Sequence, residues 1–302
     1  MPSLRNMRLQ IRSVKNIAQV TRALEAVSAS KVRKAQLAVL ATRQYASKAL
    51  QILQHLSQQP GNDGGAFHPL LQTRKAVRNI TVVLFTSDRG LCGAYNTNVL
   101  RAALAFARAQ TAPVRFVAVG KKGRDLLIRR RQNVVGEFVG LPSAPSFVDI
   151  ASIGRLLVED FLAGRTDRVV LIYTDFVNML RQEPHVMQVL PLQPESDDAH
   201  KATAGTRVQP GPQAAFTYEP SREELLDVII PRFTQLQVYQ ALLEAFASEH
   251  AARMTAMRNA TDNAKDLISS LQLDYNKARQ LSITSDMLDI AGGAEALTQA
   301  QK

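Results

Sequence analysis

Residues 11–36 read IRSVKNIAQVTRALEAVSASKVRKAQ, a stretch without proline or glycine. Apolar side chains recur in it three and four positions apart, which is the period of one face of an α-helix. The region free of both helix breakers extends over 3–59, and a second such region covers 232–291. Both are far longer than a usual globular helix, so the pattern indicates a coiled coil or a helical repeat.

Each region carries a narrow apolar stripe of the kind that two paired helices bury. The N-terminal stripe consists of Leu4, Met7, Ile11, Val14, Ile17, Val20, Leu24 and Val27. The C-terminal stripe consists of Phe233, Leu236, Tyr239, Leu243, Phe246, His250, Met254, Met257, Ala260, Ala264, Leu267 and Leu271. The simplest arrangement pairs the two helices antiparallel as a shaft. A bundle of core helices is the alternative, although the chain has no third region of comparable length.

The middle of the chain, residues 76–192, has a different pattern. Apolar, β-branched runs occupy 78–86, 114–119, 134–139 and 168–174, and an edge strand is expected over 185–192. Helical spacing lies between them, over 96–110, 121–131 and 149–162. This alternation predicts a Rossmann-like α/β domain with a mostly parallel sheet.

The expected fold class is therefore α/β plus a long antiparallel coiled coil. Its expected parts are an N-terminal helix over 1–59, the α/β domain over 76–192, a polar loop over 193–220 and a C-terminal helix over 221–302.

Charge is unevenly distributed along the chain, whose formal net charge is +11. Residues 1–60 carry +9, whereas residues 221–302 carry −3. A basic helix suits nucleic acid, an anionic lipid surface or an acidic protein. A single cysteine excludes an internal disulfide and a cysteine-based zinc cluster. No apolar run is long enough to span a membrane, and the N-terminus has no secretory signal.

The loop TSDRGLCGAYNTN, residues 86–98, follows the first expected strand and contains two glycines and the only cysteine. It matches neither the G-x-G-x-x-G nor the G-x-x-x-x-G-K-[ST] pattern of phosphate-binding loops. A tight turn, with Asn96 or Thr97 capping the next helix, is the favoured interpretation. A nucleotide site in this loop and a nucleophilic Cys92 are the weaker alternatives.

No pattern of metal ligands or catalytic partners emerges from the five scattered histidines. The residues alone leave two classes open besides a nucleotide-binding enzyme. One is a protein built for contact with other proteins, and the other is a basic coiled-coil binder of nucleic acid. The absence of aromatic residues from 1–44 weakens the nucleic-acid alternative.

Several segments resemble one known family. The stretch at 11–36, the loop at 86–98, and the segments QVYQALLEAFASEHAARMTAMRNATDNAKDLI (237–268) and YNKARQLSITSDMLDIAGGAEAL (275–297) are similar to the gamma subunit of F-type ATP synthases. The resemblance runs through the whole chain in order. It implies a rotor subunit of the central stalk, which couples rotation of the membrane ring to conformational changes at catalytic sites on beta subunits.

The resemblance also implies partners and contact residues. The partners are the alpha and beta subunits of the catalytic head, the epsilon subunit and the ring of c subunits, with no nucleic acid. Leu24, Arg253, Gln280 and Thr284 match family positions that contact the head, and Asp88 and Arg89 are expected at an inter-subunit loop. The chain is expected to need no cofactor and to catalyse nothing alone. It is expected at the cytoplasmic side of a bacterial inner membrane, as a peripheral protein.

Overall fold

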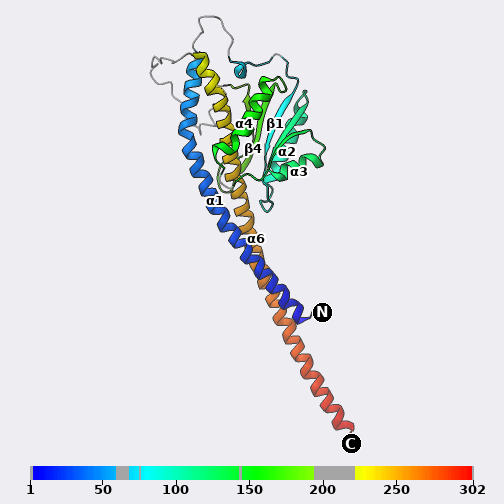
Figure 1. The fold of residues 1–302 in the computed structure, drawn as a ribbon. Helices are drawn as coiled ribbons and strands as arrows, with labels where there is room; N and C mark the ends of the chain where they lie inside the picture. The colour runs from blue at the N-terminus through cyan, green and yellow to red at the C-terminus, as the bar shows by residue number, and fades with distance from the viewer. Residues whose placement is uncertain (1–2, 59–67, 75, 143–144, 194–221, 301–302) are drawn as a thin grey trace. The chain divides into compact units, whose positions relative to one another are not determined.

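The computed structural model describes residues 3–58, 68–74, 76–142, 145–193 and 222–300. Two long helices, α1 (Leu4–Gln58) and α6 (Arg222–Ala300), bracket an α/β domain in sequence (Figure 1). The chain divides into two compact units: residues 1–27 with 254–302, and residues 28–253. The loop expected over 193–220 falls, apart from Gln193, outside the described residues.

The first unit is an antiparallel helix pair. The Thr21 and Thr261 hydroxyls lie 2.7 Å apart, and Arg8 Nε donates to the Tyr275 hydroxyl at 2.7 Å. Glu25 forms an ion pair with Arg258 at 3.4 Å. Residues further along α1 thus contact residues earlier in α6, as in an antiparallel coiled coil. The expected antiparallel pairing is confirmed within this unit.

The seam of this pair differs from the expected stripe in its middle part. Ile11 and Thr21 are buried, whereas Ile17, Val20 and Val27 are 53%, 59% and 53% exposed. On α6 Leu267 is likewise 49% exposed. The large hydrophobic residues at these four positions made them look like the seam, but in this part the helices meet at the smaller side chains of Thr21, Thr261 and Ala264. The seam prediction is wrong there.

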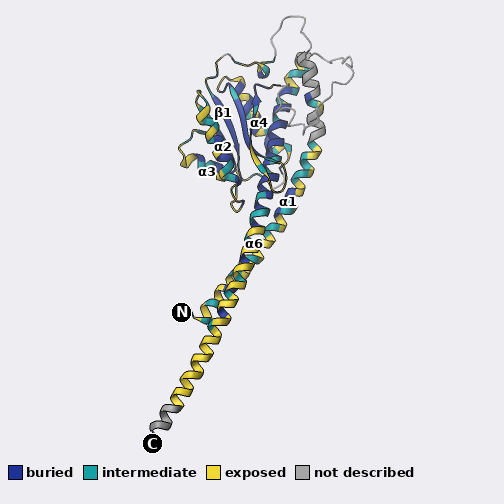
Figure 2. Cartoon of the chain, turned by 180° about the vertical axis from the view of Figure 1, so that it is seen from behind, coloured by how far each residue is buried: buried dark blue, intermediate teal, exposed yellow. Residues whose placement is uncertain are grey.

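Beyond the start of α1, helix α6 has no partner helix among the described residues. Arg8 lies across from Tyr275, so the first residue of α1 is level with about residue 279. Every residue from Arg279 to Ala294 is exposed, and Figure 2 shows this part of α6 in yellow. At 1.5 Å per residue, the part of α6 after residue 279 extends roughly 30 Å as a single helix.

The second unit contains a five-stranded sheet. Its strands are β1 (Ile80–Phe85), β2 (Val114–Val119), β3 (Val134–Phe138), β4 (Arg168–Phe176) and β5 (Gln182–Leu190). The helices between them are α2 (Tyr95–Ala109), α3 (Lys121–Arg129) and α4 (Phe147–Leu162), and a short helix η1 (Pro69–Leu71) precedes them. The expected alternation of strands and helices is confirmed.

The strand order is β3-β2-β1-β4-β5, with β5 the only antiparallel member. The mostly parallel sheet is thus confirmed, as is the edge position of the last strand. Pro184 lies inside β5, which an edge strand tolerates because a missing N–H can face outward.

Each face of the sheet has its own core. Val83, Phe85 and Leu171 face α4 and residues 230–245 of α6. Their neighbours Val82 and Leu84 face α2 and α3. Alternate residues of a strand point to opposite faces, and burial on both sides explains the nearly continuous apolar runs. The domain therefore packs directly onto the α6 segment of its own unit.

Gly120 ends β2 in a conformation that a side chain would disrupt. Its φ is +100°, and a Cβ there would lie 2.1 Å from the Thr86 carbonyl oxygen. We expect Gly120→Ala to lower the free energy of unfolding by about 2 to 4 kcal/mol, measured by urea denaturation. Gly90→Ala is the control, because a Cβ there meets nothing within 4 Å in the described structure. Equal stability of the two variants would contradict this account.

Candidate functional site

The loop at 86–98 is bound tightly at the carboxyl ends of three parallel strands. Asp88 accepts the Lys121 N–H at 2.8 Å through Oδ1 and the Gly140 N–H at 3.0 Å through Oδ2. The Thr86 hydroxyl donates to the Val119 carbonyl at 3.0 Å and accepts the Gly123 N–H at 2.8 Å. The loop after β1 thereby fixes the chain that follows β2 and β3.

A small polar cluster holds the loop's centre. The Asn96 amide oxygen accepts the Ser87 N–H at 3.0 Å, and its nitrogen lies 3.2 Å from Cys92 Sγ. Asn96 therefore turns back to the loop and does not cap α2. Helix α2 begins after Ala94 without a side-chain cap. Thr97 does not cap it either, because its hydroxyl donates to the Ala94 carbonyl and does not accept a backbone N–H there. The expected capping role of these two residues is wrong.

Cys92 is a buried packing residue with a small polar neighbour. It is 2% exposed, and burial raises the pKa of its thiol more than the Ser87 hydroxyl and Arg253 lower it. The reactive form of cysteine is the thiolate, which a raised pKa disfavours. The geometry gives no support to the alternative of a nucleophilic cysteine.

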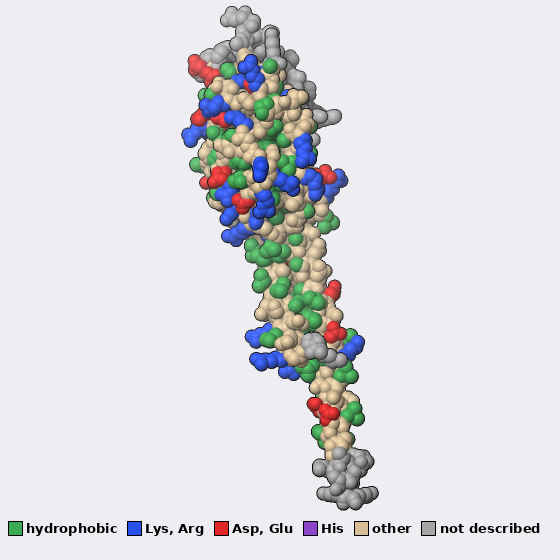
Figure 3. All heavy atoms as spheres, turned by 90° about the vertical axis from the view of Figure 1, so that its right-hand side faces the viewer, with side chains coloured by type: hydrophobic (Ala, Val, Ile, Leu, Met, Phe, Trp, Pro, Cys, Tyr) green, Lys and Arg blue, Asp and Glu red, His purple; other side chains and the backbone are tan. Residues whose placement is uncertain are grey.

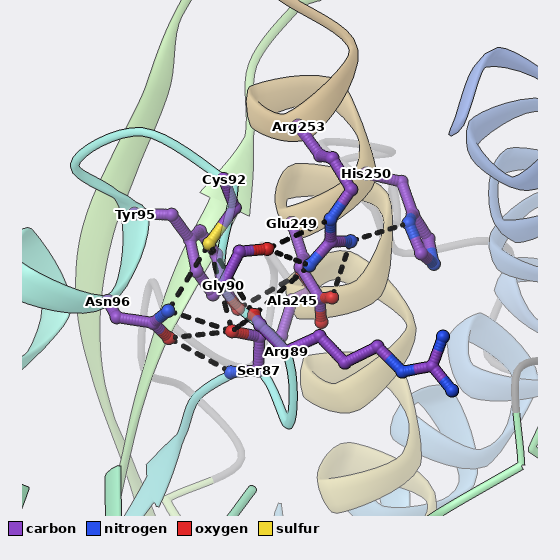
Figure 4. Close-up of polar contacts among 10 residues, drawn as sticks. All are labelled: Ser87, Arg89, Gly90, Cys92, Tyr95, Asn96, Ala245, Glu249, His250 and Arg253. Atoms are coloured by element: carbon purple, nitrogen blue, oxygen red, sulfur yellow. Dashed lines mark hydrogen bonds and ion pairs between the residues drawn. The ribbon is translucent and has the colours of Figure 1, made fainter. Parts of the chain in front are cut away.

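Arg253 connects the loop to α6 (Figure 4). Its Nε donates to the Gly90 carbonyl at 3.3 Å, and its Nη2 donates to the Arg89 and Gly90 carbonyls, both at 3.2 Å. Its Nη1 donates to Glu249 at 2.7 Å and lies 3.1 Å from His250 Nδ1. A guanidinium has five N–H donors, so these contacts use all of them inside the chain.

Burial changes the pKa values of the two ionisable side chains that contact Arg253, Glu249 and His250. Desolvation raises the pKa of Glu249, although the adjacent Arg253 cation lowers it. Burial, Arg253 and Lys31 together lower the pKa of His250 to about 4. At neutral pH, His250 is therefore an uncharged acceptor for the guanidinium, which suits a permanent structural contact.

The predicted contact residues lie in three places. Asp88, Arg89 and Arg253 meet at the loop just described. Gln280 and Thr284 lie on the exposed end of α6, where the Thr284 hydroxyl donates to the Gln280 carbonyl at 3.0 Å. Leu24 is half-buried in the helix pair, about twenty residues along the pair from Gln280.

Sequence reasoning missed Glu249 and His250. Their signal was a Glu and an Arg four residues apart, at 249 and 253, in an otherwise apolar segment of helix. Such a pair faces one side of the helix and must be paired when it is buried.

The described residues contain no group of three or more His, Cys, Asp or Glu side chains placed to hold a metal ion. In the same part of the chain, no helix combines the length and apolar character that crossing a membrane requires. Lys and Arg side chains dominate the face of the α/β domain that carries α2 and α3, and exposed hydrophobic side chains line the helices (Figure 3).

These features define a class: a coiled-coil protein with a parallel α/β domain clamped to one of its long helices. Comparisons with known proteins give the family. A family model described as ATP synthase matches residues 3–297. The ATP synthase gamma chain of Roseiflexus castenholzii is 46% identical over 99% of this chain and 100% of its own length. That of Chloroflexus aurantiacus is 45% identical, with the same coverage.

Solved structures show the same fold. A chain of the Euglena gracilis mitochondrial ATP synthase, in an OSCP/F1/c-ring structure, has a TM-score of 0.66 at 20% identity, covering 99% of this chain and 96% of its own. A chain of the Tetrahymena thermophila mitochondrial central stalk has a TM-score of 0.57 at 24% identity, covering 80% and 99%. The chain belongs to the ATP synthase gamma chain family, and the resemblance seen in the sequence is confirmed.

The lowered pKa of His250 has a consequence for stability against pH. Between about pH 4 and 6.5 the unfolded chain binds a proton at His250 that the folded chain does not, so stability falls as the pH drops through this window. We expect the loss to reach on the order of 2 to 3 kcal/mol relative to His250→Gln, measured by urea denaturation at each pH. Glu249, whose raised pKa acts in the opposite direction, is present in both chains. A constant difference between the two chains from pH 7 to 4 would contradict the assignment.

Proposed function

We propose that this chain is the central-stalk rotor subunit of a proton-translocating ATP synthase. It couples rotation of a membrane ring to conformational changes at catalytic sites on beta subunits. The family membership supports the assignment to the complex. The structural observation that carries the mechanical role is the end of α6, which continues past α1 as a single helix with nothing in the described chain covering it.

That end of α6 is apolar as well as uncovered. Leu281, Met287, Leu288 and Ile290 are 59%, 66%, 67% and 73% exposed. Large apolar side chains gathered on a surface mark a contact with another molecule. An apolar sleeve in the catalytic head of alpha and beta subunits would cover this end and let it turn, because apolar contacts have no fixed direction.

The basic N-terminal helix favours an acidic surface on the same head. Attraction between such exposed charges weakens with salt, so assembly should be salt-sensitive. Leu24, Gln280 and Thr284 are proposed to contact the head directly. Arg253 and Asp88 would act on a partner through Arg89, whose exposed side chain projects from the loop that they hold.

The epsilon subunit and the ring of c subunits are the proposed partners of the α/β domain. Such a chain would work as a peripheral protein on the cytoplasmic side of a bacterial inner membrane. We propose that it is non-catalytic alone and needs no cofactor. The loop at 86–98 supports this proposal, because Asp88, Asn96 and the Arg89 and Gly90 carbonyls are bonded to the chain's own groups.

The test is reconstitution with alpha and beta subunits and, in vesicles, with the membrane ring. We expect a stable complex whose ATP hydrolysis drives proton pumping only when this chain is present. An isolated chain that hydrolyses ATP would contradict the non-catalytic assignment. Failure to join the complex, together with DNA binding that falls steeply with salt, would favour the nucleic-acid alternative.

The exposed end of α6 provides a sharper variant. Leu288→Ser should change the stability of the free chain by no more than about 0.5 kcal/mol, because Leu288 is 67% exposed. Its affinity for the alpha–beta head should nevertheless fall, measured by co-purification at graded subunit concentrations. The matched variant is Ile11→Ser in the seam, 7% exposed, which should cost about 2 to 4 kcal/mol in the free chain. Unchanged head affinity in Leu288→Ser would remove this residue from the interface.

A further inference from the structure

Three side chains join the α/β domain to α6 through backbone carbonyl groups. The Tyr239 hydroxyl, on α6, donates to the Pro145 carbonyl at 3.1 Å. The Tyr95 hydroxyl, on α2, donates to the Ala245 carbonyl at 3.1 Å. Arg253 is the third, and it is the last residue of α6 that belongs to the unit with the α/β domain. Besides these three, His68 Nε2, just before η1, lies 3.1 Å from Asp227 Oδ1 on α6, and the rest of the contact is mainly apolar packing.

Apolar packing and hydrogen bonds resist movement differently. Burial of apolar surface depends mainly on area, so it constrains the rotation of a domain about the helix axis less sharply than a directional contact does. A hydrogen bond depends on both distance and angle. The guanidinium of Arg253 is planar and rigid, and it holds two successive carbonyls from one side while Glu249 and His250 hold it from the other.

The loop that Arg253 grips is itself continuous with the sheet. Asp88 and Thr86 attach it to the chain after β2 and β3, as described above. A displacement of Arg253 would therefore be carried into the carboxyl ends of three strands, and not absorbed by a loose turn.

The backbone of the loop also carries strain. Leu91 has φ +62° and a side chain 65% exposed, so neither a glycine nor burial of its own side chain accounts for this conformation. A non-glycine residue persists there only when its surroundings hold it, and such positions concentrate at functional sites. The backbone just before Leu91 is held by Arg253, at the Arg89 and Gly90 carbonyls, and by the Ser87 hydroxyl, which donates to the Arg89 carbonyl at 2.7 Å.

We propose that Arg253 is a positioning residue that fixes the rotational setting of the α/β domain on α6 and transmits torque between them. The proposal rests on the rotor function proposed above. It assigns Arg253 a role inside the chain, through the backbone of residues 89 and 90. Loss of the guanidinium would leave the domain attached by apolar packing and by the Tyr239, Tyr95 and His68–Asp227 contacts. None of these contacts holds residues 89 and 90, so under load that end of the domain would slip by a small angle.

Arg74 offers a matched control. Its guanidinium also bridges a carboxylate and a carbonyl, Asp167 Oδ1 at 2.6 Å and Phe161 O at 2.7 Å. Both partners lie within the α/β domain, so Arg74→Gln removes comparable hydrogen bonds without touching α6. A variant of Arg74 therefore reports what loss of a structural arginine does by itself.

The experiment uses the whole complex in vesicles, with wild-type chain, Arg253→Gln, Arg253→Lys and Arg74→Gln. The measured quantity is the ratio of proton pumping to ATP hydrolysis. We expect the ratio to fall about fivefold in Arg253→Gln and to be unchanged in Arg74→Gln. Arg253→Lys keeps the charge opposite Glu249 but lacks the planar fork, so its ratio should lie between wild type and Arg253→Gln.

Hydrogen exchange supplies a local readout on the free chain. Amides of residues 89–93 should exchange about tenfold faster in Arg253→Lys than in wild type, with β1 unchanged. In Arg74→Gln the same loop amides should keep their wild-type rates.

The outcomes separate the two proposals. If the wild-type chain confers no proton pumping, the rotor function itself is wrong. If wild type pumps and Arg253→Gln keeps its ratio, or loses it equally with Arg74→Gln, Arg253 is only a folding residue and the positioning role is wrong. If Arg253→Gln does not fold, the same comparison is made with Arg253→Lys, where a wild-type ratio with wild-type loop exchange overturns the proposal.

Discussion

The buried guanidinium of Arg253 is the constraint on which the arrangement of the second unit depends. A cation this deeply buried is tolerated only when its donors are satisfied, and here a carboxylate, an imidazole and two carbonyls satisfy all five. Two of those partners lie on α6 and two in the loop after β1. Removing any partner would leave a donor unsatisfied at a largely buried position, so the loop and the helix stay together. The position of the sheet then follows, because the loop is bonded to the ends of three strands.

The same constraint explains the character of the loop. Its glycines and its Asp-Arg pair resemble parts of a phosphate-binding turn, yet the Asp88 carboxylate and the Arg89 and Gly90 carbonyls are bonded to groups of the chain itself. Asp88 holds two backbone amides that could otherwise face an anion, and the carbonyls of Arg89 and Gly90 point at Arg253. A turn that offers carbonyl oxygens to a cation is unsuited to a phosphate, which needs N–H groups. The loop is therefore suited to hold the Arg253 guanidinium through its backbone carbonyls.

Much of the architecture was predictable, for a physical reason. Long regions without helix breakers, and β-branched runs that alternate with helical periods, give a strong pattern over many residues, and the run at 114–119 is indeed β2. The seam was harder to predict, because large residues such as Ile17 and Val20 have a helical period whether they face the partner helix or solvent. The site was harder still. Arg253 binds backbone carbonyls, which every residue possesses, so no pattern of side-chain types could have identified Arg89 and Gly90 as its partners.

The helix pair of the first unit buries several small side chains at its seam and leaves several large ones exposed. Thr21 and Thr261 share a hydrogen bond at the seam, while Ile17, Val20 and Leu267 remain about half exposed. In an isolated coiled coil, large apolar residues fill the seam and provide most of the stability. Small polar seams bring helices close and fix their register, but they contribute little burial. The apolar surface left outside is then available to a surrounding protein, and the single helix beyond it has the same character. The stability of this unit should therefore depend on what encloses it, as suits a shaft that works inside a larger assembly.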